Sequence, residues 1–375
     1  MSPINILHIV GARPNFMKIA PVMRAIEARS ELVVTQMLVH TGQHYDATMS
    51  DVFFRDLRLP KPDLDLGVGS GSQAEQTGQI MVALERVIEE RRPDLMVAAG
   101  DVNSTLAAAL VAAKAGVPVA HVESGLRSND WTMPEEVNRV VTDRLATLLL
   151  TPSPDANANL AREGADPARV HFVGNVMIDS LHAGLAAAKA SHVHEMLGIA
   201  PNGYALITLH RPANVDDPRV LAPIIEVLLE VASDLPLVFP VHPRTRKRLD
   251  EMHLANRVQP QKNLRLVDPF GYLDFLALIA SARLVLTDSG GIQEETTALG
   301  IPCLTLRENT ERPITAEVGT NVLVGRDPAR ILPEVKRVLS GRGKAGRVPE
   351  KWDGRAAERV AEVIEQWWKR GGPRA

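Results

Sequence analysis

The stretch LVLTDSGGIQEETTALGIPCLTLRENTERP, residues 284–313, decides how this chain is interpreted. It begins as an apolar strand, breaks at residues 287–291, and continues as a predicted helix over residues 292–299 that stops at Gly300. A strand that leads through two glycines into a helix leaves backbone N–H groups unpaired where the helix dipole favours negative charge. The pattern is typical of a phosphate-binding turn. An ordinary strand-to-helix turn with Ser289 as N-cap explains the same residues, so both interpretations stay open here.

The rest of the chain repeats this alternation of short apolar runs and longer helical ones. Predicted strands lie at residues 4–10, 33–39, 95–99, 117–122 and 147–151, and again at 205–209, 237–241, 264–266 and 284–286. Such alternation gives parallel strands joined by crossover helices. We therefore predict an α/β protein made of two Rossmann-like, doubly wound parallel-sheet domains, with the ligand in a cleft between them.

We place the domain boundary after Asn175. Residues 1–175 form the predicted N-terminal domain and residues 176–354 the C-terminal one. The last run is amphipathic, and its apolar face carries Ala356, Val360, Val363, Ile364 and Trp367. We expect residues 355–375 to return to the first domain as a docked helix.

Composition limits the possible partners. Of the 375 residues, 45% are hydrophobic and 23% are charged, which is typical of a globular protein. The formal net charge of −3 gives no overall attraction to nucleic acid or to an anionic membrane. The single cysteine, Cys303, lies in an apolar run and is predicted to be a core residue. No apolar run reaches the length of roughly 18 to 20 residues that a membrane helix needs, so we expect a cytoplasmic protein.

Polar residues follow nearly every predicted strand. In the first domain they are Arg13, Gln43 with His44, Asp101 and Glu123, and in the second they are His210 with Arg211, His242 with Arg244, Asp268, and Asp288 with Ser289. The cations, together with Lys18 and Arg312, suit a diphosphate. The first strand is not followed by Gly-x-Gly-x-x-Gly and the chain has no Walker-type lysine loop, so a dinucleotide or a P-loop nucleotide is disfavoured.

Each carboxylate also has a purely structural explanation. Asp101 precedes a helix and is a candidate N-cap. Glu123 is close enough in sequence to pair with Arg127, and Glu135 and Glu136 stand in a first helical turn, where the dipole favours acidic residues. Taken together, however, the carboxylates suit departure of a diphosphate from a sugar with proton exchange at the adjacent carbon. Such a reaction needs acid/base groups on both faces of the ring.

The chain resembles the non-hydrolysing UDP-N-acetylglucosamine 2-epimerases. The resemblance spans nearly the whole chain and rests on GARP (11–14), TGQHYD (41–46), GD (100–101), HVESGLR (121–127), PEEVNR (134–139), VGN (173–175), TLHR (208–211), VHP (241–243), TDSGGIQEE (287–295) and TERP (310–313). It implies the glycosyltransferase-B architecture and reversible conversion of UDP-N-acetylglucosamine to UDP-N-acetylmannosamine, by elimination of UDP to 2-acetamidoglucal and re-addition. It also implies no cofactor, no metal and a homodimer.

The resemblance assigns roles to individual residues. The catalytic set would be Asp101, Glu123, Glu135 and His210. The UDP-binding set would be Arg13, Lys18, His242, Phe270, Tyr272, Ser289, Gly290, Gly291, Glu295 and Arg312. A second UDP-N-acetylglucosamine, bound as an activator, would meet Gln43, Glu136, Arg211 and His242.

One departure from the family pattern bears on the activator. Related sequences with that regulation continue the His-Arg pair with Arg-Glu-Asn, whereas this chain has Pro212 and Ala213 before Asn214. The departure puts the activator site in doubt and leaves room for a modified substrate, such as a uronic acid derivative. A glycosyltransferase of the same architecture, a non-catalytic sugar-nucleotide sensor and a hydrolysing epimerase also stay open as functions.

Overall fold

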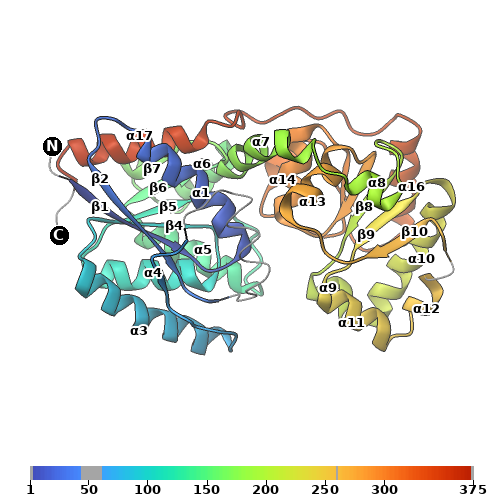
Figure 1. The fold of residues 1–375 in the computed structure, drawn as a ribbon, viewed down its shortest axis with the longest axis horizontal. Coiled ribbons are helices and arrows are strands. Elements are labelled where there is room, and N and C mark those ends of the chain that lie inside the picture. The colour runs from blue at the N-terminus through green and yellow to red at the C-terminus, as the bar shows by residue number, and fades with distance from the viewer. Residues whose placement is uncertain (1–2, 44–60, 259–260, 373–375) are drawn as a thin grey trace. The chain divides into compact units, whose positions relative to one another are not determined.

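The computed structural model describes residues 3–43, 61–258 and 261–372. The chain divides into two compact units, one of Met1–Ala183 with Glu350–Ala375 and the other of Gly184–Pro349. Each contains a parallel sheet flanked by helices (Figure 1). The predicted fold class of two Rossmann-like α/β domains is therefore confirmed, including the C-terminal helix that belongs to the first domain.

The described residues of the first unit form a seven-stranded sheet in the order β3-β2-β1-β4-β5-β6-β7. Its strands are β1 (Ile4–Val10), β2 (Val34–His40), β3 (Leu64–Asp65), β4 (Leu95–Ala99), β5 (Val119–Val122), β6 (Leu148–Thr151) and β7 (Val170–Phe172). All neighbouring pairs are parallel. The central strands are buried along their full length because helices cover both faces, which explains their continuous apolar runs.

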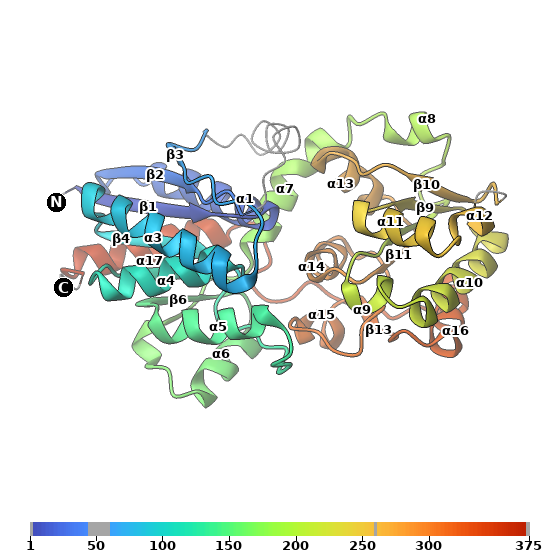
Figure 2. The same cartoon turned by 90° about the horizontal axis from the view of Figure 1, so that it is seen from below.

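The helices of this unit lie on both faces of the sheet. Among the described residues they are α1 (Arg13–Glu27), α3 (Gln73–Arg91), α4 (Asn103–Lys114), α5 (Pro134–Leu145), α6 (Pro154–Arg162), a 3₁₀ turn (Pro167–Arg169), α7 (Val176–Ala188) and α17 (Ala356–Lys369). Figure 2 shows α3, α4 and α5 side by side on one face, and α1 packs against α17 on the other (Figure 1). The predicted domain boundary, after Asn175, lies at the start of α7. The two units divide after Ala183, within the same helix.

The C-terminal helix α17 docks through a face close to the predicted one. Its side chains at Val360 and Ile364 are fully buried, whereas Trp368 rather than Trp367 is the more buried tryptophan. Asp179 of α7 accepts hydrogen bonds from the backbone N–H groups of Ala356 and Ala357 at 3.1 and 2.8 Å. This carboxylate therefore caps the start of α17 within the first unit.

The described residues of the second unit form a six-stranded parallel sheet in the order β10-β9-β8-β11-β12-β13. The strands are β8 (Ala205–Thr208), β9 (Leu237–Pro240), β10 (Leu264–Val267), β11 (Leu284–Thr287), β12 (Cys303–Thr305) and β13 (Asn321–Leu323). The helices are α8 (Val193–Leu197), α9 (Pro212–Val215), α10 (Pro218–Asp234), α11 (Pro243–Glu251), α12 (Ala255–Val258), α13 (Tyr272–Ala280), α14 (Gly290–Leu299), α15 (Pro313–Glu317) and α16 (Pro328–Leu339).

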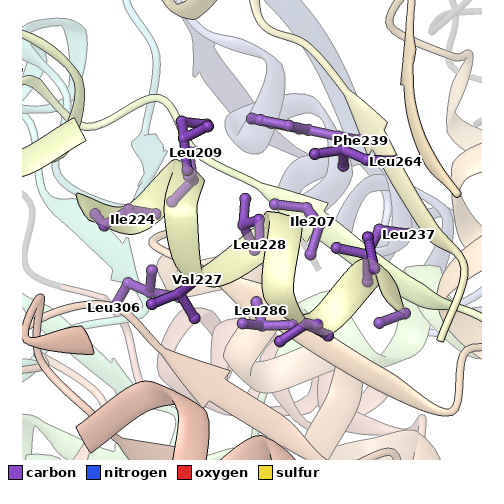
Figure 3. Packing of buried hydrophobic residues seen from close by; sticks show 14 of the residues in the cluster. Ile207, Leu209, Ile224, Val227, Leu228, Leu237, Phe239, Leu264, Leu286 and Leu306 are labelled. Atoms are coloured by element: carbon purple, nitrogen blue, oxygen red, sulfur yellow. The ribbon is translucent and has the colours of Figure 1, made fainter. Parts of the chain in front are cut away.

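The core of the second unit lies between α10 and the sheet. Figure 3 shows Ile224, Val227 and Leu228 of α10 within this cluster. The strands and the residues that follow them contribute Ile207, Leu209, Leu237, Phe239, Leu264, Leu286 and Leu306. Cys303 in β12 is fully buried, which confirms its predicted place in the core.

The strand order places a switch point in each sheet. The first strand of each unit, β1 or β8, lies between the second strand and a strand reached by crossing over, β4 or β11. Loops that leave neighbouring strands in opposite directions open a crevice at the strands' carboxyl ends, where ligands of such sheets bind. In the first unit these loops carry Gly11 and Asp101, and in the second they carry His210 and Ser289.

No described helix is long and apolar enough to cross a membrane.

Candidate active site

The turn after β11 is organised by Asp288, whose side chain is fully buried. Its Oδ2 accepts hydrogen bonds from the backbone N–H of His210 at 3.0 Å and of Arg211 at 2.9 Å. The side chain of Asn214 donates to the same oxygen at 3.1 Å, and Nδ1 of His210 lies 2.9 Å from Oδ1. Burial alone raises the pKa of Asp288, but the hydrogen bond and charge of His210, with the backbone donors, hold that pKa below its ordinary value.

Helix α14 begins at Gly290, two residues earlier than predicted, and ends as predicted at Gly300. Ser289 occupies the N-cap position, but its side chain makes no capping hydrogen bond there. The backbone N–H of Ser289 is satisfied by Thr287 Oγ1 at 3.0 Å. The first turn of α14 is thus left without a side-chain cap, which is the condition that an anion-binding helix start requires.

Gly290 is required by close packing. A Cβ atom at this position would stand 2.6 Å from both Arg312 Nη1 and Glu311 Oε1. Any larger residue would push the ion pair between these two side chains away from the start of α14. The glycine therefore permits the loop that carries Arg312 to lie against the helix start.

Most cations of the second unit are already paired with carboxylates. Arg312 contacts Glu294 at 2.8 Å and Glu311 at 2.5 Å. Arg307 contacts Glu311 at 2.8 Å, and Arg244 pairs with Asp216. Burial opposes ionisation of Glu311, but Arg312 and Arg307 hold its pKa well below its usual range. The local excess of positive charge is therefore smaller than the residue types alone suggest.

Two imidazoles lie beside the turn after β8. The ring of His242 is 5.8 Å from that of His210, measured between centroids. His242 is the N-cap of α11, and its Nδ1 accepts from the backbone N–H of Arg244 at 3.2 Å. Arg211 contacts Glu311 at 3.9 Å. The structure thus brings the rings of His210 and His242 together, and the side chain of Arg211, next in the chain, contacts Glu311.

Glu295 carries a buried carboxyl group on α14. Burial, and then the charge of the neighbouring Glu294, raise its pKa to about 8. Tyr272 at the start of α13 is also buried, and burial together with Glu295 raises its pKa well above the ordinary value. Phe270, just before α13, is half-buried. The pKa of Glu295 places a neutral carboxyl group here at pH 7.

In the first unit, Lys18 and Glu123 form a buried ion pair. Lys18 Nζ of α1 lies 2.5 Å from Glu123 Oε2 at the end of β5, and both side chains are less than a tenth exposed. Gly100 lies against this lysine with a φ of +73°, and a Cβ there would stand 2.9 Å from Lys18 Nζ. The alternative pairing of Glu123 with Arg127 is therefore wrong, because Arg127 binds Asp143 and Glu163 instead.

Asp101 is not the N-cap of α4. The cap is Val102, which offers no side-chain hydrogen bond, so the structural explanation for Asp101 is wrong. Its carboxylate is a quarter exposed and lies 3.5 Å from Nη1 of Arg139. The side chain of Asn138 donates to its backbone oxygen at 2.8 Å. Asp101 and Glu123 follow the neighbouring strands β4 and β5, so both stand at the same edge of the sheet.

The two glutamates at the start of α5 differ. Glu136 is buried and accepts from Ser128 N at 3.0 Å and from Asn129 N at 2.8 Å, so it shapes the preceding loop. Glu135 is half-buried, and within the described residues no hydrogen bond or ion pair engages it. Glu135 is therefore the one of the pair that is available for a ligand.

Behind Asp101 lies a buried network that the sequence did not reveal. His121 in β5 has Nδ1 at 2.6 Å from Asp143 and Nε2 at 2.8 Å from the carbonyl oxygen of Gly100. Burial opposes the charge of Asp143, but His121 and Arg127 hold its pKa below the ordinary value. A histidine within an apolar strand was the one available signal of this network.

The remaining predicted residues of the first unit are Gln43 and Arg13. Gln43 Oε1 accepts from the backbone N–H and the hydroxyl group of Ser104 at 3.1 and 2.7 Å, so its side chain holds the start of α4. Arg13 begins α1, but its side chain is outside the described residues, as is His44.

Comparisons with known proteins agree with these observations. A family model described as UDP-N-acetylglucosamine 2-epimerase matches residues 24–365. The UDP-N-acetylglucosamine 2-epimerase of Methanocaldococcus jannaschii is 40% identical over 366 residues, covering 95% of this chain and 97% of that protein. The UDP-2,3-diacetamido-2,3-dideoxy-D-glucuronate 2-epimerase of Pseudomonas aeruginosa is 40% identical over 365 residues, covering 96% of this chain and 99% of that protein.

A solved structure agrees as well. The crystal structure of the Methanocaldococcus jannaschii UDP-GlcNAc 2-epimerase in complex with UDP-GlcNAc and UDP is similar to this one with a TM-score of 0.89 and 40% identity, covering 96% of this chain and 99% of that chain. The chain belongs to the UDP-N-acetylglucosamine 2-epimerase family of isomerases.

Proposed function

We propose that this protein interconverts UDP-N-acetylglucosamine and UDP-N-acetylmannosamine by inversion at C2. The observation that carries the proposal is the pair of carboxylates Asp101 and Glu123, which follow neighbouring strands of one sheet but differ in environment. Glu123 is buried against the ammonium group of Lys18, whereas Asp101 is partly exposed beside Arg139. Inversion at a carbon needs acid/base groups with access to two faces, and two carboxylates held differently meet that need.

The reaction proceeds in two balanced steps. A carboxylate takes the proton from C2, the C–H electron pair forms the C1–C2 double bond, and the C1–O bond breaks with its electrons moving to the diphosphate. The products held in the site are UDP and 2-acetamidoglucal. Protonation of C2 from the other face and return of UDP to C1 complete the inversion. Asp101, Glu123 and Glu135 are our candidates for these proton transfers.

The second unit is our candidate for the nucleotide site. The uncapped start of α14 after Ser289 suits the diphosphate, and the buried Glu295 suits the hydroxyl groups of the ribose. His210 is suited to stabilising the charge that the diphosphate gains as the C1–O bond breaks. Lys18, by contrast, is engaged by Glu123, which favours a role in positioning that carboxylate over the predicted contact with UDP.

We also propose that the other UDP-binding candidates of the second unit contribute to the nucleotide site. His242, Phe270 and Tyr272 lie near the same edge of the second sheet, and Arg312 would act through its hold on the start of α14. The activator site has less support, because Gln43 and Glu136 already serve internal loops. The family resemblance leads us to propose further that the enzyme is a cytoplasmic homodimer.

Incubation with UDP-N-acetylglucosamine alone tests the proposed activity. We expect UDP-N-acetylmannosamine to form, and the same final mixture to be reached from either sugar nucleotide, because the reaction is reversible. Product identity is read by chromatography and ¹H NMR. Accumulation of free UDP in step with product would instead indicate a hydrolysing epimerase, and a requirement for an acceptor would indicate a glycosyltransferase. Parallel incubation with a UDP-diacetamido-uronic acid tests the modified substrate.

The carboxylates have a separate test. Asp101→Asn and Glu123→Gln should each lower kcat by about 10²-fold or more, because each removes a proton-transfer group. UDP binding, measured by calorimetry, should change little in either variant. Glu89→Gln, an exposed change on α3 of the same unit, is the matched control and should keep full activity. Normal turnover in both site variants would refute the assigned roles and support a different set of acid/base groups.

We expect Glu295 to release a proton when UDP binds. Its pKa of about 8 keeps the free protein's carboxyl group mostly protonated at pH 7. Ribose hydroxyl groups that donate to this side chain favour the ionised form and lower its pKa, so binding should release up to about one proton at pH 7. Calorimetry in buffers of different ionisation enthalpy measures that release. It should vanish in Glu295→Gln, and equal proton release in the variant and the wild type would show that Glu295 does not meet the nucleotide.

A further inference from the structure

The His210 ring is held by a carboxylate that can only accept hydrogen bonds. His210 Nδ1 lies 2.9 Å from Asp288 Oδ1, and the Asp288 side chain is completely buried. An ionised carboxylate has no proton to donate, so the proton in this hydrogen bond belongs to Nδ1. The reduced pKa of Asp288 agrees with an ionised group at neutral pH. The geometry therefore selects one tautomer of the ring.

The carboxylate itself is fixed from three sides. The backbone N–H groups of His210 and Arg211 donate to Oδ2, and so does the side chain of Asn214. The same Nδ2 of Asn214 also donates to the backbone oxygen of Leu306 at 3.0 Å, which ties this amide to the loop after β12. Rotation of the carboxylate would break several of these bonds in a buried place, where an unpaired polar group is costly. Asp288 is thus a rigid support for the ring.

The other ring nitrogen is left for a ligand. The His210 side chain is 40% exposed, and within the described part of the chain its Nε2 has no hydrogen-bond partner. The turn after β11, which carries Asp288, leads directly into the start of α14, the candidate phosphate position. A proton taken up on Nε2 would complete an imidazolium ion whose positive charge is balanced by the buried carboxylate behind it.

We propose that Asp288 is a positioning residue that holds a proton on Nδ1 of His210 and balances the charge of the protonated ring, so that the Nε2–H group of this imidazolium ion donates a hydrogen bond to the leaving diphosphate. This inference rests on the proposed epimerase function. As the C1–O bond breaks, its electron pair moves to a phosphate oxygen, and the hydrogen bond from Nε2–H becomes stronger as negative charge develops there. Asp288 is buried behind the ring and acts on the leaving group through His210.

The wild-type protein alone provides the first test. Protein labelled with ¹⁵N at histidine shows the protonation of each ring nitrogen by long-range ¹H–¹⁵N NMR, and the His210 signals are those missing from a His210→Gln sample. We expect a proton on Nδ1 of His210, whether the ring is neutral or charged. A neutral ring with its proton on Nε2 and none on Nδ1 would overturn the inference, whatever the activity of the protein.

Asp288→Asn provides the second test. The amide group of the new side chain would donate to Nδ1, so the ring should change to the tautomer with its proton on Nε2 and lose its stabilised charge. We expect kcat to fall by about 10²- to 10⁴-fold while KM for the sugar nucleotide changes little. An unchanged kcat with a changed tautomer would refute the catalytic part of the inference. If this variant does not fold, the protonation of His210 Nδ1 in the wild-type spectrum decides whether the inference holds.

Asn214→Ala is the matched control. It removes a hydrogen bond to the same carboxylate but leaves the bond between Asp288 and His210 intact, so the His210 signals should keep the proton on Nδ1. Its unfolding temperature should fall, because a buried amide and two hydrogen bonds are lost. If the tautomer of His210 also changed in this control, the change in Asp288→Asn would be explained by general loosening of the turn. It would then not show that the Asp288 carboxylate holds the proton on Nδ1. If the wild type does not epimerise UDP-N-acetylglucosamine, the proposed function fails, whereas the tautomer result still decides the role of Asp288.

Discussion

A single buried negative charge holds the switch point of the second sheet together. Asp288 follows β11, but the groups that it binds belong to the turn after β8 and to α9. Through Asn214 the same cluster reaches the loop after β12. A buried carboxylate is tolerated only when donors compensate for the lost water, and here backbone and side-chain donors do so. The spacing of three strand ends, and hence the start of α14, depends on that compensation.

In the first unit, buried charges are compensated by ion pairs. Lys18 and Glu123 neutralise each other in the interior, and His121, Asp143 and Arg127 form a second compensated group behind the Gly100–Asp101 turn. Gly100 has the positive φ and the small size that allow Lys18 to pass so close to the backbone. Breaking either group would leave a buried charge without a partner, which is costly. The apolar sheets supply the stability, and these polar groups determine the arrangement of the loops at their edges.

Local patterns predicted the fold correctly and indicated candidate site residues at the strand ends. Alternation of apolar strands with helices, and polar residues just after each strand, are visible in a few neighbouring positions, as at Asp101, His210 and Asp288. Tertiary partners are not visible in this way. The sequence suggested Arg127 as the partner of Glu123 because it is near in the chain, whereas the structure supplies Lys18 from α1. Likewise, the sequence suggested that the positive charge of Arg312 was available for a ligand, whereas in the structure Arg312 is paired with Glu294 and Glu311. A contact between segments that are distant in the chain can be identified only once the fold is known.

In the proposed reaction, carboxylates at the strand ends break and remake the C2–H bond of the sugar. The most direct measurement is incubation with UDP-N-acetylglucosamine in deuterated water, followed by mass spectrometry and ¹H NMR of the sugar nucleotides. Removal of the C2 proton by a side chain and its return from solvent predict deuterium at C2 of the UDP-N-acetylmannosamine and, with time, of the recovered UDP-N-acetylglucosamine. Formation of the manno product with the original hydrogen still at C2 would rule out proton exchange with solvent through these carboxylates.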